Sequence, residues 1–369
     1  MRNNSTHFAE PVYKPQILDG QNKDDHHSIE MLIDDMETRV IDTYFNQLKE
    51  LIKLRNPSRL YTEETLAKEA HLFVQNHPNH SNWVYYPWNK SLVHLLKKEE
   101  FIEVRTNRNR NKITSDEQTI LLGKTIGVIG LSVGHSIALT LVTERLCSTI
   151  RIADFDTLEL SNLNRIRTGV YNLGVPKVII AAREIAEIDP YMHVEIFPEG
   201  ITEENIDSFF ISDNQKLDIL VEVCDGIDVK INSRLKAREL KVPVVMDTND
   251  RGMMDIERFD LEPNRPILHG LTGETDLTQI KNLTNEEKVP FVLNIIGAET
   301  MSDRLKESMK EIKRTISTWP QLASSVVLGA ALCADVCRRI LLNQFHDSGR
   351  YYMDIEQQIA DKKLESTTK

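Results

Sequence analysis

The sequence contains few cysteines and no paired cysteine motif. Its 369 residues include only Cys147, Cys224, Cys333 and Cys337, and none of these forms a C-x-x-C pair. A structural zinc site of the common kind needs two such pairs, and dense cysteine frameworks are typical of small secreted domains. The sequence therefore predicts no zinc site and indicates a reducing compartment.

An excess of basic residues and a long apolar run are also missing. The chain has 45 Lys and Arg against 56 Asp and Glu, a net charge of −11, whereas a general nucleic-acid surface requires a basic face. The first residues, MRNNSTHFAEP, lack the apolar core of a signal peptide. The most apolar stretch, residues 326–342, is interrupted by Asp335, Arg338 and Arg339. We therefore expect a cytoplasmic protein that binds neither nucleic acid nor a membrane.

Regular alternation of strand and helix patterns begins at Lys124. Apolar runs of strand length alternate with amphipathic stretches of helix length, an order typical of a parallel sheet covered by helices. The sequence predicts strands at 125–130, 149–154, 192–197, 217–223 and 243–247, and helices at 134–147, 176–188, 202–210 and 227–240. The expected fold class is α/β, a Rossmann-like, doubly wound and mostly parallel sheet.

Four regions are expected along the chain. They are a flexible arm at 1–27, an N-terminal α+β extension at 28–115, a nucleotide-binding domain at 116–300, and a C-terminal helical segment at 301–369 that completes that domain. Apolar spacing predicts one or two helices within 28–56 and another at 63–76, and NWVYYPW predicts a short strand. A last strand is expected near 350–355.

Residues 124–177 carry the strongest functional signal. The first predicted strand leads into a glycine turn, Gly130-Leu131-Ser132-Val133-Gly134, and the second ends in Asp154-Phe155-Asp156. A nucleotide needs backbone N–H groups at a helix N-terminus for its phosphates and a carboxylate at the next strand end for its ribose. Gly130, Ser132, Gly134, Asp154 and Asp156 are therefore predicted to bind a nucleotide.

Two further motifs follow and carry a family resemblance. They are Asn162-Leu163-Asn164-Arg165 and Gly174-Val175-Pro176-Lys177. With the glycine turn and the acidic strand end, they resemble the ThiF/MoeB-type adenylyltransferases of the ubiquitin-activating-enzyme superfamily, which transfer AMP from ATP-Mg to a carboxylate. The resemblance implies that Asp154 binds the ribose, that Asn162, Arg165 and Lys177 contact ATP, and that Asp225 is the Mg-associated acid.

A basic cluster precedes the first predicted strand and includes Arg108 and Arg110. Relatives carry an arginine in this region that reaches across a homodimer to the triphosphate, so the resemblance implies a homodimer in which Arg108 or Arg110 has this role. The glycine turn departs from the family pattern at Ser132, Val133 and His135, where side chains could narrow the phosphate cradle.

The position of the cysteines limits the reaction. No cysteine lies between Cys224 and Cys333, where relatives that activate proteins place a thioester nucleophile. We therefore expect the reaction to stop at an acyl-adenylate of a small molecule, or of the C-terminus of a small protein or peptide, or to pass it to a separate acceptor.

The whole chain also resembles the first half of bacterial ThiF–nitroreductase fusion proteins. That resemblance implies a nitroreductase-like or small-protein partner. Two alternatives to adenylylation stay open from the sequence: an NAD- or FAD-binding Rossmann module that supports a redox partner, and a non-catalytic scaffold with the ThiF fold.

Overall fold

The structure is a computed structural model, and it describes residues 12–271, 291, 293–295 and 297–361. The chain forms two compact units. The first extends to Thr119 and includes Thr143–Arg145 and Ala182–Met192. The second comprises Ile120–Val142, Leu146–Ala181 and the chain from His193 onward.

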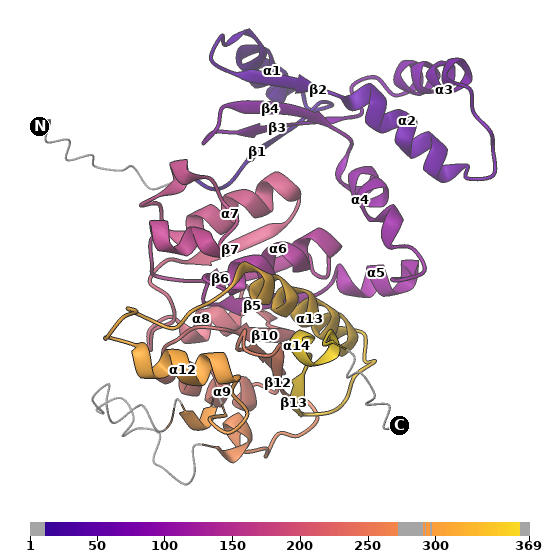
Figure 1. The fold of residues 1–369 in the computed structure, drawn as a ribbon. Coiled ribbons are helices and arrows are strands. Elements are labelled where there is room, and N and C mark those ends of the chain that lie inside the picture. Colours follow the sequence, from indigo (N-terminus) through magenta and orange to yellow (C-terminus); the bar gives the residue numbers. More distant parts are fainter. Residues whose placement is uncertain (1–11, 272–290, 292, 296, 362–369) are drawn as a thin grey trace, which may run out of the picture. The chain divides into compact units, whose positions relative to one another are not determined.

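The first unit contains a four-stranded sheet with helices beside it (Figure 1). The strand order is β1 (Gln16–Asp19), β3 (Asn82–Tyr86), β4 (Ser91–Leu95) and β2 (Arg39–Asp42). The helices are α1 (Lys23–Asp34), α2 (Tyr44–Arg55), α3 (Glu63–Asn76), α4 (Lys98–Thr106), the 3-10 turn η1 (Asn107–Asn109), and α5 (Ser115–Leu121), which ends in the second unit. Leu48 and Leu51 of α2 pack with Ala70 of α3 to form its core.

The first unit differs from the sequence prediction at two places. The helix predicted at 63–76 matches α3, and α1 and α2 lie in the stretch 28–56 where one or two helices were predicted, but the strand β2 between them was not predicted. Residues 16–27, predicted to belong to a flexible arm, instead form β1 and the start of α1. The cause is tertiary pairing: Ile17 and Leu18 lie opposite Val84 and Trp83 of β3, a partner that a four-residue pattern does not reveal.

The second unit is built on a seven-stranded sheet. Its order is β13 (Gly349–Tyr352), β12 (Met253–Glu257), β11 (Val244–Asp247), β10 (Ile219–Glu222), β5 (Thr125–Ile129), β6 (Thr149–Ala153) and β7 (His193–Phe197). The five strands from β11 to β7 are parallel, and β12 and β13 are antiparallel to their neighbours. The predicted α/β class with a mostly parallel sheet is therefore confirmed.

Helices and short turns connect the strands of this sheet (Figure 1). They are α6 (Gly134–Glu144), η2 (Leu160–Asn164), η3 (Val170–Asn172), α7 (Lys177–Ile188), which ends in the first unit, α8 (Ile206–Phe210), the hairpin β8 (Ile211–Ser212) and β9 (Gln215–Lys216), α9 (Ile227–Glu239), η4 (Ile267–Gly270), α12 (Asp303–Glu311), α13 (Ala323–Leu341) and α14 (Ile355–Gln358). All residues of β5 and β6 are buried, as expected for central parallel strands. The helix α13 packs on β10, β11 and β12.

The strand order creates a switch point between β5 and β10. The chain runs from β5 outward to β6 and β7, then returns to add β10 and β11 on the other side. In open α/β sheets, the crevice at the carboxyl ends of the strands beside such a point is where ligands bind. A ligand-binding site is therefore expected at the loops after β5 and β10.

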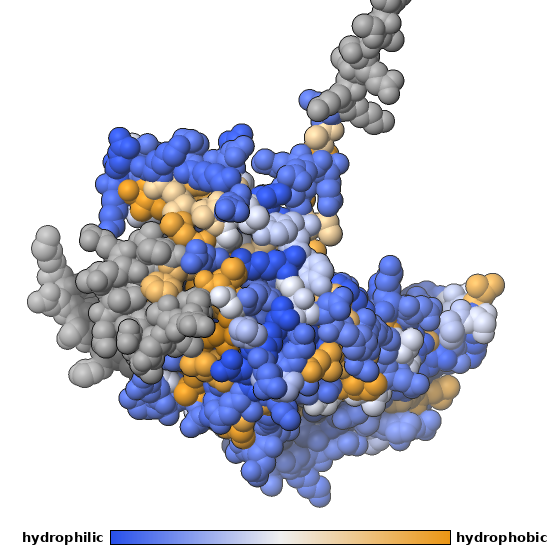
Figure 2. All heavy atoms as spheres, turned by 90° about the horizontal axis from the view of Figure 1, so that it is seen from below, coloured by the Kyte–Doolittle hydropathy of each residue, from blue (hydrophilic) through white to orange (hydrophobic). Residues whose placement is uncertain are grey.

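Hydrophilic side chains predominate on the face drawn in Figure 2, where hydrophobic residues gather only in small groups. No helix among the described ranges combines the length and the apolar character needed to cross a membrane.

Candidate nucleotide site

The glycine turn after β5 fits its surroundings only with glycine at two positions. Gly130 has a φ of +89°, and a Cβ atom there would lie 2.8 Å from the backbone N and Cα of Cys224. A Cβ atom on Gly134 would lie 2.9 Å from Cγ1 of Val128. The turn after β5 therefore touches the turn after β10, which carries Asp225.

The three residues that depart from the family glycine pattern differ in burial and contacts. Val133 and His135 are buried, while Ser132 is half-buried and its Oγ accepts a hydrogen bond from Nε of Arg165 at 2.9 Å. The backbone N–H groups of Ser132 and Val133 have no acceptor among the described residues. Two donors at the start of α6 thus stay available to an anion.

Asp154 follows β6 and closes the same corner. Its Oδ2 accepts the N–H of Leu131 at 2.6 Å, and its Oδ1 accepts the N–H of Asp156 at 2.8 Å. Burial raises the pKa of Asp154 above its ordinary value, although the Leu131 N–H and the nearby Lys177 oppose the shift. The carboxylate is therefore fixed against the glycine turn with further acceptor capacity on each oxygen.

Lys177 and Asn162 are both buried beside this corner. Nζ of Lys177 lies 2.7 Å from Oδ2 of Asp156, an exposed carboxylate. Oδ1 of Asn162 accepts the N–H of Glu159 at 3.0 Å and so caps η2. The structure gives Asn162 a role in shaping the loop, and its predicted contact to ATP stays a prediction.

Arg165 is bonded to the glycine turn and is close enough to the turn after β10 to be affected by the charge of Asp225. Besides Ser132, it donates from Nη1 to Oδ1 of Asn164 at 2.8 Å. Burial lowers the pKa of Arg165, and the negative charge of Asp225 raises it in part. Asp225 itself is exposed, in the turn between β10 and α9. The structure therefore brings Ser132, Asp154, Asp156, Arg165, Lys177 and Asp225 together at the switch point.

Arg108 and Arg110 belong to the other compact unit. Arg108 lies in η1 and Arg110 follows it, and both are exposed. Their predicted contact with a triphosphate stays a prediction.

A cavity of about 1200 Å³ opens beside Asp225. Val133 of the glycine turn and Asp225 of the turn after β10 line one side of it, and residues of α12, α13 and α14 line its other walls. Small-molecule pockets usually measure about 300–1,000 Å³, so this cavity is large enough for a small molecule. Of the predicted site residues, only Asp225 lines it.

Asp247 ends β11 on the wall of this cavity. Its carboxyl group is buried, and burial raises the pKa of Asp247 to about 7, although the N–H of Asn249 opposes the shift.

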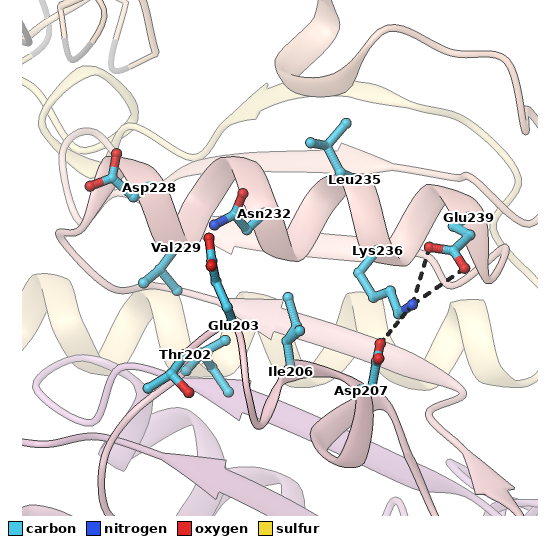
Figure 3. Close-up of a pocket in the computed structure, with 11 residues that line it drawn as sticks. Thr202, Glu203, Ile206, Asp207, Asp228, Val229, Asn232, Leu235, Lys236 and Glu239 are labelled. Atoms are coloured by element: carbon cyan, nitrogen blue, oxygen red, sulfur yellow. Dashed lines mark hydrogen bonds and ion pairs between the residues drawn. The ribbon is translucent and has the colours of Figure 1, made fainter. Parts of the chain in front are cut away.

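A second cavity, of about 540 Å³, lies between the segment 201–207 and α9 (Figure 3). Its one lysine, Lys236, is bonded to Asp207 at 2.7 Å and to Glu239 at 3.1 Å. None of the predicted site residues lines it.

Sequence reasoning missed a group of buried charges behind Asp225. Glu222, Arg234 and Glu257 are fully buried, and Lys230 lies beside them. The signal that could have found them is a glutamate that ends an apolar strand, followed by basic residues spaced four apart on the next helix.

No group of three or more His, Cys, Asp or Glu side chains suited to a metal ion occurs within the described part of the chain. The donor set nevertheless fits Mg²⁺ bound to a nucleotide, because Mg²⁺ commonly uses one or two carboxylates together with phosphate oxygens and water. Asp225 is the exposed carboxylate at that place, and Arg165, Lys177 and the two N–H groups suit the phosphates.

Sequence comparisons place the chain among known proteins. An uncharacterized protein of Mycobacterium tuberculosis (strain CDC 1551 / Oshkosh) is 45% identical over 296 residues, 79% of this chain but 41% of that protein. The molybdopterin-synthase adenylyltransferase of Haemophilus influenzae is 24% identical over 46% of this chain and 70% of its own. The tRNA threonylcarbamoyladenosine dehydratase of Bacillus subtilis is 25% identical over 65% of this chain and 98% of its own.

The ThiF family profile matches residues 106–318, more than half of the chain. This match confirms the resemblance inferred from the motifs around Asp154, Arg165 and Lys177. The chain therefore belongs to the ThiF family, which comprises adenylyltransferases and related enzymes.

Proposed function

We propose that this chain binds ATP with Mg²⁺ and transfers AMP to a carboxylate. The observation that carries the proposal is the position of Arg165, whose guanidinium group is bonded to Ser132 of the glycine turn and lies within the electrostatic influence of Asp225. A site for NAD needs N–H groups for the pyrophosphate and a carboxylate for the ribose, whereas the added cations Arg165 and Lys177 and the exposed carboxylate of Asp225 suit a triphosphate with its metal ion.

The chemistry requires positioning and charge stabilisation rather than a protein nucleophile. An oxygen of the acceptor carboxylate attacks the α-phosphorus, the bond to the bridging oxygen breaks, and pyrophosphate leaves with the electron pair. Negative charge grows on the phosphate oxygens, and Arg165 and Lys177 are placed to stabilise it. When bound, Mg²⁺ supplies further charge neutralisation on these oxygens.

The predicted residues have separate roles in the proposal, in which Asn162, Arg165 and Lys177 contact ATP. Asp154 holds the ribose, the turn from Gly130 to Gly134 holds the phosphates, and Asp225 holds the nucleotide-bound Mg²⁺. Asp156 keeps Lys177 in place, as their 2.7 Å contact supports.

The acceptor is a small molecule or the C-terminus of a small protein or peptide, in the cavity beside Asp225. Because residues 225–332 contain no cysteine, we propose that the acyl-adenylate is not passed to a thiol of that stretch. The proposal includes a cytoplasmic homodimer in which Arg108 or Arg110 reaches a triphosphate, and a nitroreductase-like or small-protein partner. The division of the chain at residues 115 and 300 is proposed with it.

Calorimetry with ATP tests the proposal. The wild-type chain should bind ATP in a Mg²⁺-dependent manner, and Asp225→Ala and Arg165→Ala should each lose most of that binding. Arg167→Ala, which changes an exposed arginine two residues away, is the matched control and should bind as wild type. Absence of ATP binding by the wild-type chain, or displacement of ATP by NAD, would contradict adenylylation.

A further inference from the structure

Three fully buried charged residues lie directly behind the turn that carries Asp225. Glu222 is the last residue of β10, Arg234 lies in α9, and Glu257 is the last residue of β12. Nη1 of Arg234 lies 2.5 Å from Oε2 of Glu222, and its Nε lies 2.5 Å from Oε2 of Glu257. A buried arginine thus holds two buried carboxylates from two strands of the sheet.

Glu222 is ionised in spite of its burial. Burial alone would raise the pKa of Glu222, but Lys230 and Arg234 lower it below its usual value. Nζ of Lys230 lies 3.0 Å and 3.1 Å from the two carboxylate oxygens. Burying a charged pair is costly, and hydrophobic residues of similar volume can often replace such a pair without loss of stability. Stability alone therefore does not explain a buried, ionised Glu222.

The carboxylate of Glu222 also binds the turn itself. Its Oε1 accepts the backbone N–H of Cys224 at 2.9 Å, and Cys224 is the residue before Asp225. On its other side, the backbone of Cys224 is the group that Gly130 approaches so closely that a Cβ atom would lie 2.8 Å away. The turn before Asp225 is therefore held between a buried carboxylate and the glycine turn.

We propose that Glu222 is a positioning residue for Asp225, and that its ionised carboxylate fixes the β10–α9 turn so that Asp225 meets a nucleotide-bound divalent cation. The inference rests on the proposed function. Lys230 and Arg234 keep Glu222 charged and oriented, and the hydrogen bond to Cys224 transmits this orientation to the next residue.

Glu257 provides a matched control within the same network. It is as deeply buried as Glu222 and accepts an equally short hydrogen bond from Arg234. Its second bond, however, is to the backbone N–H of Leu268 in η4, at 2.5 Å, and not to the turn of Asp225. Loss of either carboxylate should damage the packing to a similar extent, but only loss of Glu222 should alter Asp225.

The experiment compares Glu222→Gln with Glu257→Gln in the full chain. A glutamine at 222 offers one carbonyl oxygen to the three donors of Lys230, Arg234 and Cys224, so the turn loses its acceptor for much of the time. ATP binding is measured by calorimetry with Mg²⁺ and with EDTA, and backbone hydrogen exchange is measured at Cys224 and Leu268.

We expect Glu222→Gln to bind ATP about tenfold more weakly than wild type in Mg²⁺, and as wild type in EDTA, the change expected for a hydrogen bond to a charged group. Exchange at Cys224 should become faster in this variant alone. Glu257→Gln should bind ATP as wild type and show faster exchange at Leu268. Where Glu222→Gln does not fold, Glu222→Asp keeps the charge but shortens the reach, and the same results are expected.

Two results would overturn the inference. One is equal Mg²⁺-dependent affinity in the variants of Glu222 and Glu257 while the wild-type chain binds Mg-ATP. The other is exchange at Cys224 that is unchanged in the variant of Glu222. A wild-type chain that binds no Mg-ATP would instead contradict the proposed function, and the exchange comparison would still decide whether Glu222 holds the turn.

Discussion

The carboxyl group of Asp247 lies directly against the backbone of Gly329 in α13. A Cβ atom on Gly329 would stand 1.9 Å from Oδ2 of Asp247. That oxygen has no hydrogen-bond partner among the described residues, whereas Oδ1 accepts the N–H of Asn249 at 3.0 Å. The end of β11 and the helix α13 therefore approach each other to a distance that only glycine allows, on one wall of the cavity beside Asp225.

Gly329→Ala should destabilise the protein. The added methyl group would overlap the Asp247 carboxyl, so either α13 or the end of β11 must move, and overpacking of this kind costs about 1–3 kcal/mol. The free energy of unfolding, measured with urea, checks this. Gly123→Ala is the control, because a Cβ atom there would meet its nearest neighbour at 3.4 Å, and its change should stay within about 0.5 kcal/mol.

Asp247→Asn should change how stability depends on pH. Burial raises the pKa of Asp247 from its ordinary 3.8 to about 7. Between these values the folded protein holds a proton that the unfolded chain has released, so the unfolding free energy falls as the pH rises and levels off above pH 7. Asparagine does not ionise, and the variant should gain about 2–3 kcal/mol relative to wild type between pH 5 and pH 8.

Urea unfolding at pH 5, 6, 7 and 8 measures this difference. Asp213→Asn, an exposed aspartate in the turn between β8 and β9, serves as the control and should track the wild-type curve. A difference between Asp247→Asn and wild type that is independent of pH would show that Asp247 is ionised throughout this range.

The parallel core of the fold is predictable because its strands are continuous apolar runs. β5 and β6 are buried along their whole length, and each predicted range agrees with the observed strand to within one residue. β12 was missed for the opposite reason. Its sequence, MMDIE, contains Asp255 and Glu257, which resemble loop residues until Arg234 and Arg350 are seen to pair with them. These two partners are 23 and 95 residues away in the sequence, and a local pattern does not contain that information.

Gly130→Ala should impair both stability and nucleotide binding. The φ of +89° is unfavourable for alanine, and the methyl group would meet the backbone of Cys224 at 2.8 Å. We expect a loss of about 1–3 kcal/mol of unfolding free energy and weaker ATP binding, because the turns after β5 and β10 must separate. Thermal unfolding and calorimetry test the two effects.

Gly226→Ala is the control in the opposing turn. Gly226 has a φ of −71°, and a Cβ atom there would lie 3.6 Å from its nearest neighbour. The unfolding free energy of Gly226→Ala should therefore lie within about 0.5 kcal/mol of that of wild type. Equal losses in the two variants would mean that the contact between Gly130 and Cys224 is not the cause.

The sequence predicts the residues of the candidate site that lie in local motifs near the ends of strands. Asp154, Arg165 and Lys177 follow recognisable motifs, and the structure places them at one corner. The bond from Arg165 to Ser132 was not predictable, because the serine was predicted to contact the nucleotide and to depart from a glycine pattern, and neither prediction involves a contact with an arginine. In the structure its hydroxyl group orients the arginine.

Arg234→Ala should be the most damaging change in the second unit. Removal of the guanidinium group leaves Glu222 and Glu257 buried without their shared cation, and breaking such a buried pair costs about 3–5 kcal/mol. The pKa of Arg234 is raised by these two carboxylates, so the arginine stays charged at all pH values at which the protein is folded. Urea unfolding at pH 7 measures the loss.

Arg238→Ala is the control. This arginine lies one turn further along α9, and its removal breaks only a 3.4 Å bond to the carbonyl of Arg265, so the variant should lose less than about 1 kcal/mol. Lys230 still pairs with Glu222 in Arg234→Ala, at 3.0 Å and 3.1 Å, so the loss should come mainly from Glu257. If the two variants proved equally stable, Glu257 would have to be protonated or solvated in the folded chain.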